Sequence, residues 1–181
     1  MRILLMGFLF SLFSKTTDAQ SIPKSIYDFK VKALDESTID FAAFKGKKIL
    51  IVNTASKCGY TPQYKNLEAL HQRYKDKLVI IGFPANNFLW QEPGDNATIA
   101  SFCQKNYGVS FLMASKISVK GSDMAPIYQW LTQKKYNHVE NSSVKWNFQK
   151  YLLDEHGHLI QMFSPGVDPL DAAITNAIDK K

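Results

Sequence analysis

Two short apolar runs on either side of a helical pattern constrain the fold of this chain more than any other feature. Residues 48–52 and 78–81 are almost continuously apolar, as in strands buried on both faces of a sheet. Between them, Thr61 and Pro62 form a helix start signal. Apolar and aromatic residues then recur at helical spacing, at Tyr64, Leu67, Leu70, His71 and Tyr74. A β-α-β unit of this kind requires parallel strands and a right-handed crossover.

The remaining patterns complete an α/β architecture. We expect further strands at residues 25–34, 151–153 and 159–163, and helices at residues 95–107, at 122–134 and from Asp168 onward. Gly108 closes the first of these helices. The order β-α-β, then helix, then β-β-α is the thioredoxin arrangement with an inserted helix. The sequence therefore predicts an α/β, thioredoxin-like fold with a central mixed sheet flanked by helices.

The N-terminus has the pattern of a secretory signal. Arg2 precedes an apolar run at residues 3–13, which is too short to span a bilayer as a mature helix. Small residues before Gln20 suit cleavage after Ala19. We therefore expect residues 1–19 to be a signal peptide, residues 20–181 to form one domain, and the protein to be exported to the periplasm or secreted. An uncleaved anchor or an apolar N-terminal helix is the alternative.

The charge of the chain is moderately positive. It carries 22 Lys and Arg against 16 Asp and Glu, a formal net charge of +6. The basic residues are scattered and are not interleaved with aromatics, which argues against nucleic acid as a partner. A solvated basic surface is the plain interpretation. Attraction to an acidic protein reductant or weak contact with an anionic membrane surface is the other.

The chain has two cysteines, Cys58 and Cys103, without CxxC spacing. Cys58 comes just after the first apolar run and before the predicted helix, at the edge where reacting groups gather in open α/β sheets. A helix N-terminus, with Lys57 beside it, would favour a thiolate there. Taken alone, such a residue is more often a small buried hydrophobe.

Three blocks of sequence favour a reactive Cys58 over a buried hydrophobic one. They are Asn53-Thr-Ala-Ser-Lys-Cys58-Gly-Tyr-Thr-Pro-Gln-Tyr64, then Gly82-Phe-Pro-Ala-Asn-Asn-Phe88 continuing to Gln91-Glu-Pro-Gly94, then Lys145-Trp-Asn-Phe-Gln-Lys-Tyr-Leu-Leu-Asp154. In order and separation they resemble those of glutathione peroxidases.

The resemblance implies a thiol peroxidase with no cofactor. Its site residues would be Cys58, Gln91, Trp146 and Asn147, in which an indole N–H and two amides are uncharged donors around the sulfur. Cys58 would reduce hydrogen peroxide and organic or lipid hydroperoxides and become a sulfenic acid. Cys103 stands where members that use a protein reductant carry a resolving cysteine. A thioredoxin-like protein or a small thiol would then reduce the resulting disulfide.

The sequence departs from the family at several positions. Ala85 replaces a frequent cysteine, which leaves Cys103 as the candidate resolver. Leu89 and Trp90 replace small residues and add apolar bulk beside Gln91. The segment before Trp146 lacks the longer loop of tetrameric members, so we expect a monomer.

Other interpretations remain open. A thiol-disulfide oxidoreductase would need a CxxC motif, and a non-catalytic thioredoxin-fold module would hold its two cysteines as a fixed disulfide. Cys103 could simply be a packed helix residue. His156 and His158 flank a turn without a completing carboxylate or cysteine, so we expect no metal site.

Overall fold

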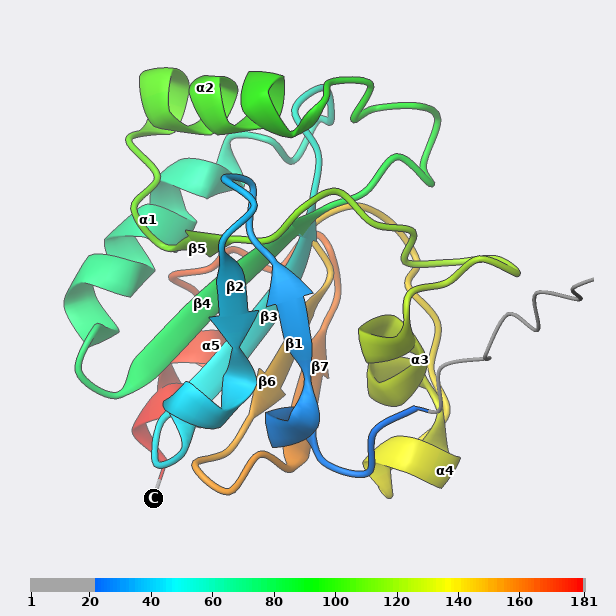
Figure 1. Cartoon of the computed structure of the whole chain (residues 1–181). Coiled ribbons are helices and arrows are strands. Elements are labelled where there is room, and N and C mark those ends of the chain that lie inside the picture. The colour runs from blue at the N-terminus through cyan, green and yellow to red at the C-terminus, as the bar shows by residue number, and fades with distance from the viewer. Residues whose placement is uncertain (1–21, 181) are drawn as a thin grey trace, which may run out of the picture.

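The computed structural model describes residues 22–180, and its centre is a five-stranded mixed sheet (Figure 1). The strand order is β5-β4-β3-β6-β7. The strands are β3 (Lys48–Thr54), β4 (Leu78–Pro84), β5 (Leu112–Met113), β6 (Lys150–Leu153) and β7 (Leu159–Phe163). β3 pairs in parallel with β4, and β4 with β5, whereas β6 and β7 run antiparallel to their neighbours. The predicted mixed sheet is confirmed.

Strand β3, at the centre of the sheet, is buried along its whole length. All seven of its residues are buried, as the unbroken apolar run predicts. Ile49 and Ile51 face one hydrophobic cluster, and Leu50 and Val52 face the other. Because successive side chains of a strand point to opposite faces, this one strand contributes to both halves of the core.

The helices are divided between the two faces of the sheet. Helices α1 (Gln63–Tyr74), α2 (Asn96–Tyr107) and α5 (Ala172–Asp179) bury their apolar residues on the face of Leu50 and Val52. The opposite face is covered by α3 (Pro126–Thr132) and by a hairpin of β1 (Lys30–Lys32) and β2 (Thr38–Asp40). The short helix α4 (Lys134–Asn137) follows α3 (Figure 1).

Several predicted boundaries were wrong. The helix expected at 122–134 begins at Pro126, because Ala125 is extended and proline occupies the first helical position. The last helix begins after Asp171, whose side chain accepts the Ala173 N–H. The strand expected at 25–34 is split into a 3-10 turn, Ile26–Asp28, and β1. Strands β2 and β5 were missed altogether, since each is too short to show alternation.

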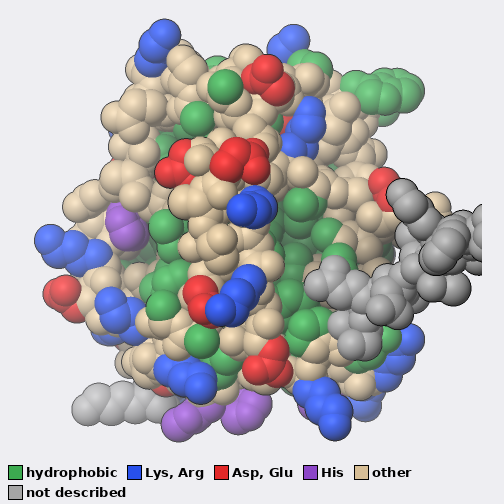
Figure 2. Space-filling model, in the orientation of Figure 1, with side chains coloured by type: hydrophobic (Ala, Val, Ile, Leu, Met, Phe, Trp, Pro, Cys, Tyr) green, Lys and Arg blue, Asp and Glu red, His purple; other side chains and the backbone are tan. Residues whose placement is uncertain are grey.

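Two further predictions concern the scattered basic residues of the surface and the signal peptide at the N-terminus. Figure 2 shows Lys and Arg side chains dispersed among Asp and Glu on the face in view. Between residues 22 and 180, no helix combines the length and apolar character needed to cross a membrane. The predicted signal peptide, residues 1–19, lies outside the described residues.

Candidate active site

Cys58 lies in the turn between strand β3 and helix α1, at the carboxyl end of the central strand. Its side chain is 8% exposed. The Tyr60 N–H donates to the Cys58 Sγ at 3.4 Å. Backbone N–H donors at such a position can stabilise negative charge on sulfur. The position of the thiol at this edge of the sheet is therefore as the sequence predicts.

Thr61 was expected to cap helix α1, but its side chain instead organises this turn. Its hydroxyl accepts the Cys58 N–H at 2.9 Å and donates to the Ala55 carbonyl at 2.9 Å. Pro62 occupies the N-cap position without a side-chain hydrogen bond. The prediction was wrong because the single hydroxyl of Thr61 is already engaged within the turn, where it fixes the backbone that carries Cys58.

Gln91 and Asn147 are brought together although they lie far apart in the sequence. The Asn147 Nδ2 donates to the Gln91 Oε1 at 2.9 Å. Asn147 is fully buried, and Gln91 is half-buried. The Gln91 carbonyl accepts the Lys57 N–H at 3.0 Å, which joins the Gln91 loop to the Cys58 turn. Because the contact with Asn147 uses the oxygen of Gln91, the amide nitrogen of Gln91 stays available as a donor.

Trp146 is tied to the end of strand β3 by Asn53. The Asn53 Nδ2 donates to the Trp146 carbonyl at 3.0 Å, and the Asn53 carbonyl accepts the Phe148 N–H at 2.6 Å. The indole ring is half-buried and lies 5.4 Å from the Phe88 ring, centroid to centroid. Three segments therefore meet at the end of one strand. Within the described residues, no hydrogen bond joins the side chains of Gln91, Trp146 or Asn147 to the Cys58 sulfur.

Backbone strain accompanies this junction. Phe148 has a φ of 67°, a left-handed conformation that is unfavourable for a bulky residue. The side chain of Phe148 is fully buried against Tyr64. Such strain persists only where the surroundings hold it, and it concentrates at functional sites. The conformation lets the chain turn from the Trp146–Asn147 segment into strand β6.

Glu92, which no sequence pattern singled out, lies within the same junction. Its side chain is fully buried, and its Oε1 accepts the Ser56 hydroxyl at 2.5 Å. Burial raises the pKa of this carboxyl, while the Ser56 contact lowers it. A charged residue between Gln91 and Pro93 is expected at an exposed position in a loop. No periodic pattern in the sequence marks Glu92 as buried.

Cys103 has a different environment. It lies in helix α2, is 3% exposed and is free, as is Cys58. Burial raises the pKa of its thiol to about 11, against a lowering contribution from the Tyr64 hydroxyl. The helical position agrees with the prediction. The role of Cys103 in a disulfide stays a prediction.

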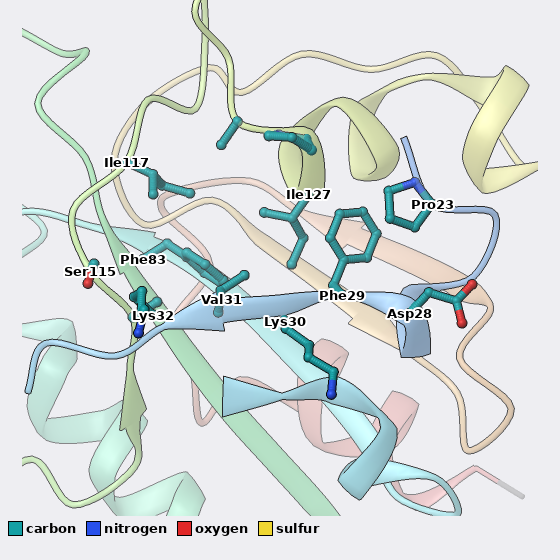
Figure 3. Close-up of a pocket in the computed structure, with 13 residues that line it drawn as sticks. Pro23, Asp28, Phe29, Lys30, Val31, Lys32, Phe83, Ser115, Ile117 and Ile127 are labelled. Atoms are coloured by element: carbon teal, nitrogen blue, oxygen red, sulfur yellow. The ribbon is translucent and has the colours of Figure 1, made fainter. Parts of the chain in front are cut away.

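A separate apolar hollow lies on the other face of the sheet (Figure 3). Its volume is about 370 Å³, and Phe29, Val31, Phe83, Ile117 and Ile127 are among the residues that line it. None of the five predicted site residues contributes to this hollow. The predicted site residues therefore lie apart from this hollow.

The fold and the site together define a class. A thioredoxin-like sheet that presents a cysteine at the carboxyl end of its central strand, next to paired side-chain amides and an indole, defines a thiol-dependent oxidoreductase. In the part of the chain that the structure describes, no group of three or more His, Cys, Asp and Glu side chains is placed to hold a metal ion.

Comparison with known proteins gives the particular family. Residues 26–132 match the family described as glutathione peroxidase. The chain is 51% identical over 140 residues to the glutathione peroxidase-like peroxiredoxin gpx1 of Schizosaccharomyces pombe, covering 76% of this chain and 87% of that protein. It is 45% identical over 159 residues to the glutathione peroxidase-like peroxiredoxin 2 of Saccharomyces cerevisiae, covering 86% and 98%.

A solved structure extends the match to three dimensions. The crystal structure of Trgpx in apo form superimposes with a TM-score of 0.65 at 36% identity, over 86% of this chain and 96% of that one. The chain belongs to the glutathione peroxidase family. It is a cysteine-based peroxidase with a thioredoxin-like fold, and the predicted family, fold class and enzyme class are confirmed.

Proposed function

We propose that Cys58 is the residue that attacks hydroperoxides and that Gln91, Trp146 and Asn147 are the donors around it. The observation that carries this proposal is the convergence of three distant segments on the end of strand β3, through the Gln91–Asn147 and Asn53–Trp146 contacts. All three side chains donate without carrying charge. They can therefore orient a peroxide and stabilise a thiolate without forming a fixed ion pair with it.

The reaction balances with two thiols and an external reductant. The Cys58 thiolate attacks the O–O bond, the leaving alkoxide or hydroxide takes up a proton, and Cys58 becomes a sulfenic acid. The Cys103 thiol then displaces water from this sulfenic acid and forms a disulfide. A thioredoxin-like protein or a small thiol reduces the disulfide and is itself oxidised. The names of the yeast relatives, which combine glutathione peroxidase and peroxiredoxin, support this cycle.

We further propose an exported monomer that touches a membrane surface weakly. The apolar run after Arg2 supports export, and the short segment before Trp146 supports the monomer. The positive net charge supports contact with anionic lipid. Determination of the N-terminal residue of the secreted protein would test the cleavage after Ala19.

Steady-state peroxide consumption tests the assignment of the two cysteines. We expect Cys58→Ser to lower turnover by at least about 1000-fold with every reductant, since the nucleophile is gone. Cys103→Ser should lose turnover with a thioredoxin-like protein and still form the sulfenic acid, which a dimedone-type probe detects. Full activity of Cys58→Ser would contradict the proposal. A disulfide that resists mild reductant in an inactive protein would favour a non-catalytic module, and protein disulfide exchange without peroxide turnover would favour an oxidoreductase.

A further inference from the structure

The loop that carries Gln91 also presents the two most exposed large hydrophobic side chains of residues 22–180. Leu89 is 68% exposed and Trp90 is 77% exposed. In Figure 1 the connection between β4 and α2 projects at the upper right, and hydrophobic side chains project from the same corner of Figure 2. Scattered apolar residues on a surface are ordinary. Two adjacent ones at a projecting tip next to a site residue are not.

The base of this tip is held by specific contacts. The Asn86 Oδ1 accepts the Glu92 N–H at 2.9 Å across the loop. The Asn87 side chain donates to the Ser118 hydroxyl and to the Lys120 carbonyl and accepts the Val119 N–H, at 2.8, 3.0 and 2.8 Å.

Both tip residues also have an unusual backbone. Leu89 and Trp90 have φ values of 51° and 52°, in the left-handed region that bulky residues disfavour. The contacts at the base of the loop hold this conformation. The outward direction of Leu89 and Trp90 is therefore built into the loop.

Three exposed lysines belong to segments that contact the loop. The Lys120 Nζ lies 5.8 Å from the centre of the Phe88 ring. The Lys57 N–H donates to the Gln91 carbonyl, and Lys145 precedes Trp146, whose ring packs on Phe88. One exposed carboxylate, Asp123, belongs to the same network through the Ser118 hydroxyl. With Asp95 at the far end of the loop, these segments carry three exposed lysines against two exposed carboxylates.

We propose that Leu89 and Trp90 insert into the interfacial layer of an anionic bilayer, with Lys57, Lys120 and Lys145 against the lipid headgroups. Tryptophan favours the headgroup region because its ring is amphipathic. Each lysine near an anionic surface adds about 1 kcal/mol of attraction. An anionic bilayer satisfies both features, whereas the core of a protein interface is depleted of charge. The proposal rests on the function proposed above, because insertion would place the Gln91 loop and Cys58 next to hydroperoxides of membrane lipids.

Vesicle binding by the full chain tests the proposal directly. The probes are vesicles of phosphatidylcholine alone and of phosphatidylcholine mixed with phosphatidylglycerol. Leu89→Asn/Trp90→Asn is the test variant, because asparagine tolerates the left-handed backbone. Val139→Asn/Leu170→Asn is the matched control, because both residues are exposed apolar positions outside helices and strands. Sedimentation and the blue shift of tryptophan fluorescence are measured.

We expect the wild type and the control to bind the mixed vesicles at least about tenfold more tightly than phosphatidylcholine alone, given the three lysines. The test variant should lose most of this binding and the fluorescence shift. Its turnover of hydrogen peroxide should stay unchanged, while its turnover of phospholipid hydroperoxide in the mixed vesicles falls in parallel with binding. Lys120→Glu should weaken binding and reduce its dependence on salt.

Other outcomes separate this proposal from the function on which it rests. Equal vesicle binding by the wild type and the test variant, or no binding by either, would overturn the insertion. A test variant that is instead slowed with a thioredoxin-like reductant would also overturn it and make the tip a protein docking surface. In a further outcome, the wild type binds vesicles and the test variant does not, while neither turns over peroxide. This outcome would support membrane insertion of Leu89 and Trp90 and would refute the proposed peroxidase site.

Discussion

The two cysteines are both free and buried, but they lie in different surroundings. Cys58 occupies an irregular turn, where its sulfur accepts a backbone N–H and its backbone is fixed by Thr61. Cys103 lies in a regular helix, its side chain is directed into the core beside Tyr64, and burial raises its pKa to about 11. We therefore expect Cys58 to react in its present position, and Cys103, whose thiol pKa is raised by burial, to react only after its helix moves.

The anchoring of helix α2 suits such a movement. Of its twelve residues, Ile99 and Cys103 are the buried ones, whereas all seven residues of strand β3 are buried. Elements with few buried apolar contacts open at a lower free energy than the core. A disulfide requires the two Cα atoms within about 7 Å. We therefore expect α2 to undock when Cys103 meets the Cys58 sulfenic acid.

Alkylation of single-cysteine variants is the strongest test of this contrast. In Cys58→Ser, Cys103 should react at pH 8 about 100-fold more slowly in the folded protein than in the unfolded chain, because its pKa rises from 9.0 to about 11 and thiolate is the reactive form. Its rate should continue to rise with pH up to about 11, whereas the rate of the unfolded chain levels off above its lower pKa. In Cys103→Ser, Cys58 should react with peroxide faster than Cys103 does in Cys58→Ser, since Cys58 is the proposed nucleophile. Equal reactivity of the two thiols toward peroxide, or a Cys103 alkylation rate that is the same in the folded and unfolded chain, would contradict the contrast.

Substitution of Ile99 tests whether α2 must move. Ile99→Ala should lower the free energy of unfolding by about 2–5 kcal/mol through the cavity it leaves. It should also speed disulfide formation after one equivalent of peroxide by about tenfold, since the undocked state becomes more populated. Ile178→Ala is the matched control, because Ile99 and Ile178 are both 1% exposed and lie in helices. The control should lose similar stability without faster disulfide formation. A disulfide rate that stays the same in Ile99→Ala would show that α2 need not move.

The fold could be predicted from the sequence where periodicity extended over several turns or a full strand. Strands β3 and β4 and helix α2, with its end at Gly108, were correctly expected, because burial on both faces and a terminal glycine leave local signals. The start of α3 was set by the extended Ala125, and the start of α5 by the Asp171 cap. In both places the sequence offered an earlier possible helix start, at residue 122 for α3 and at Asp168 for α5.

The site was less predictable from local patterns than the fold. The proximity of Gln91 and Asn147 follows from how loops at one edge of the sheet fold back, and only the resemblance to a family indicated it. No local pattern marked Glu92 as buried, and its hydrogen-bond partner Ser56 lies in a distant segment. The left-handed backbones of Leu89, Trp90 and Phe148 were equally hidden, because none of these residue types favours that conformation.

The smallest expected effect comes from the end of helix α2. Gly108 has a φ of 60°, and a Cβ added there would meet no atom within 4 Å, so Gly108→Ala carries only the backbone penalty of about 1 kcal/mol. If the end of α2 opens together with Cys103, this penalty raises the open population about fivefold and speeds disulfide formation by up to that factor. Gly46→Ala is the matched control, since Gly46 also has a positive φ, 83°, and free space. It should lower stability equally and leave the disulfide rate unchanged. Equal acceleration in both variants would mean that global destabilisation, and not the opening of α2, brings Cys103 to Cys58.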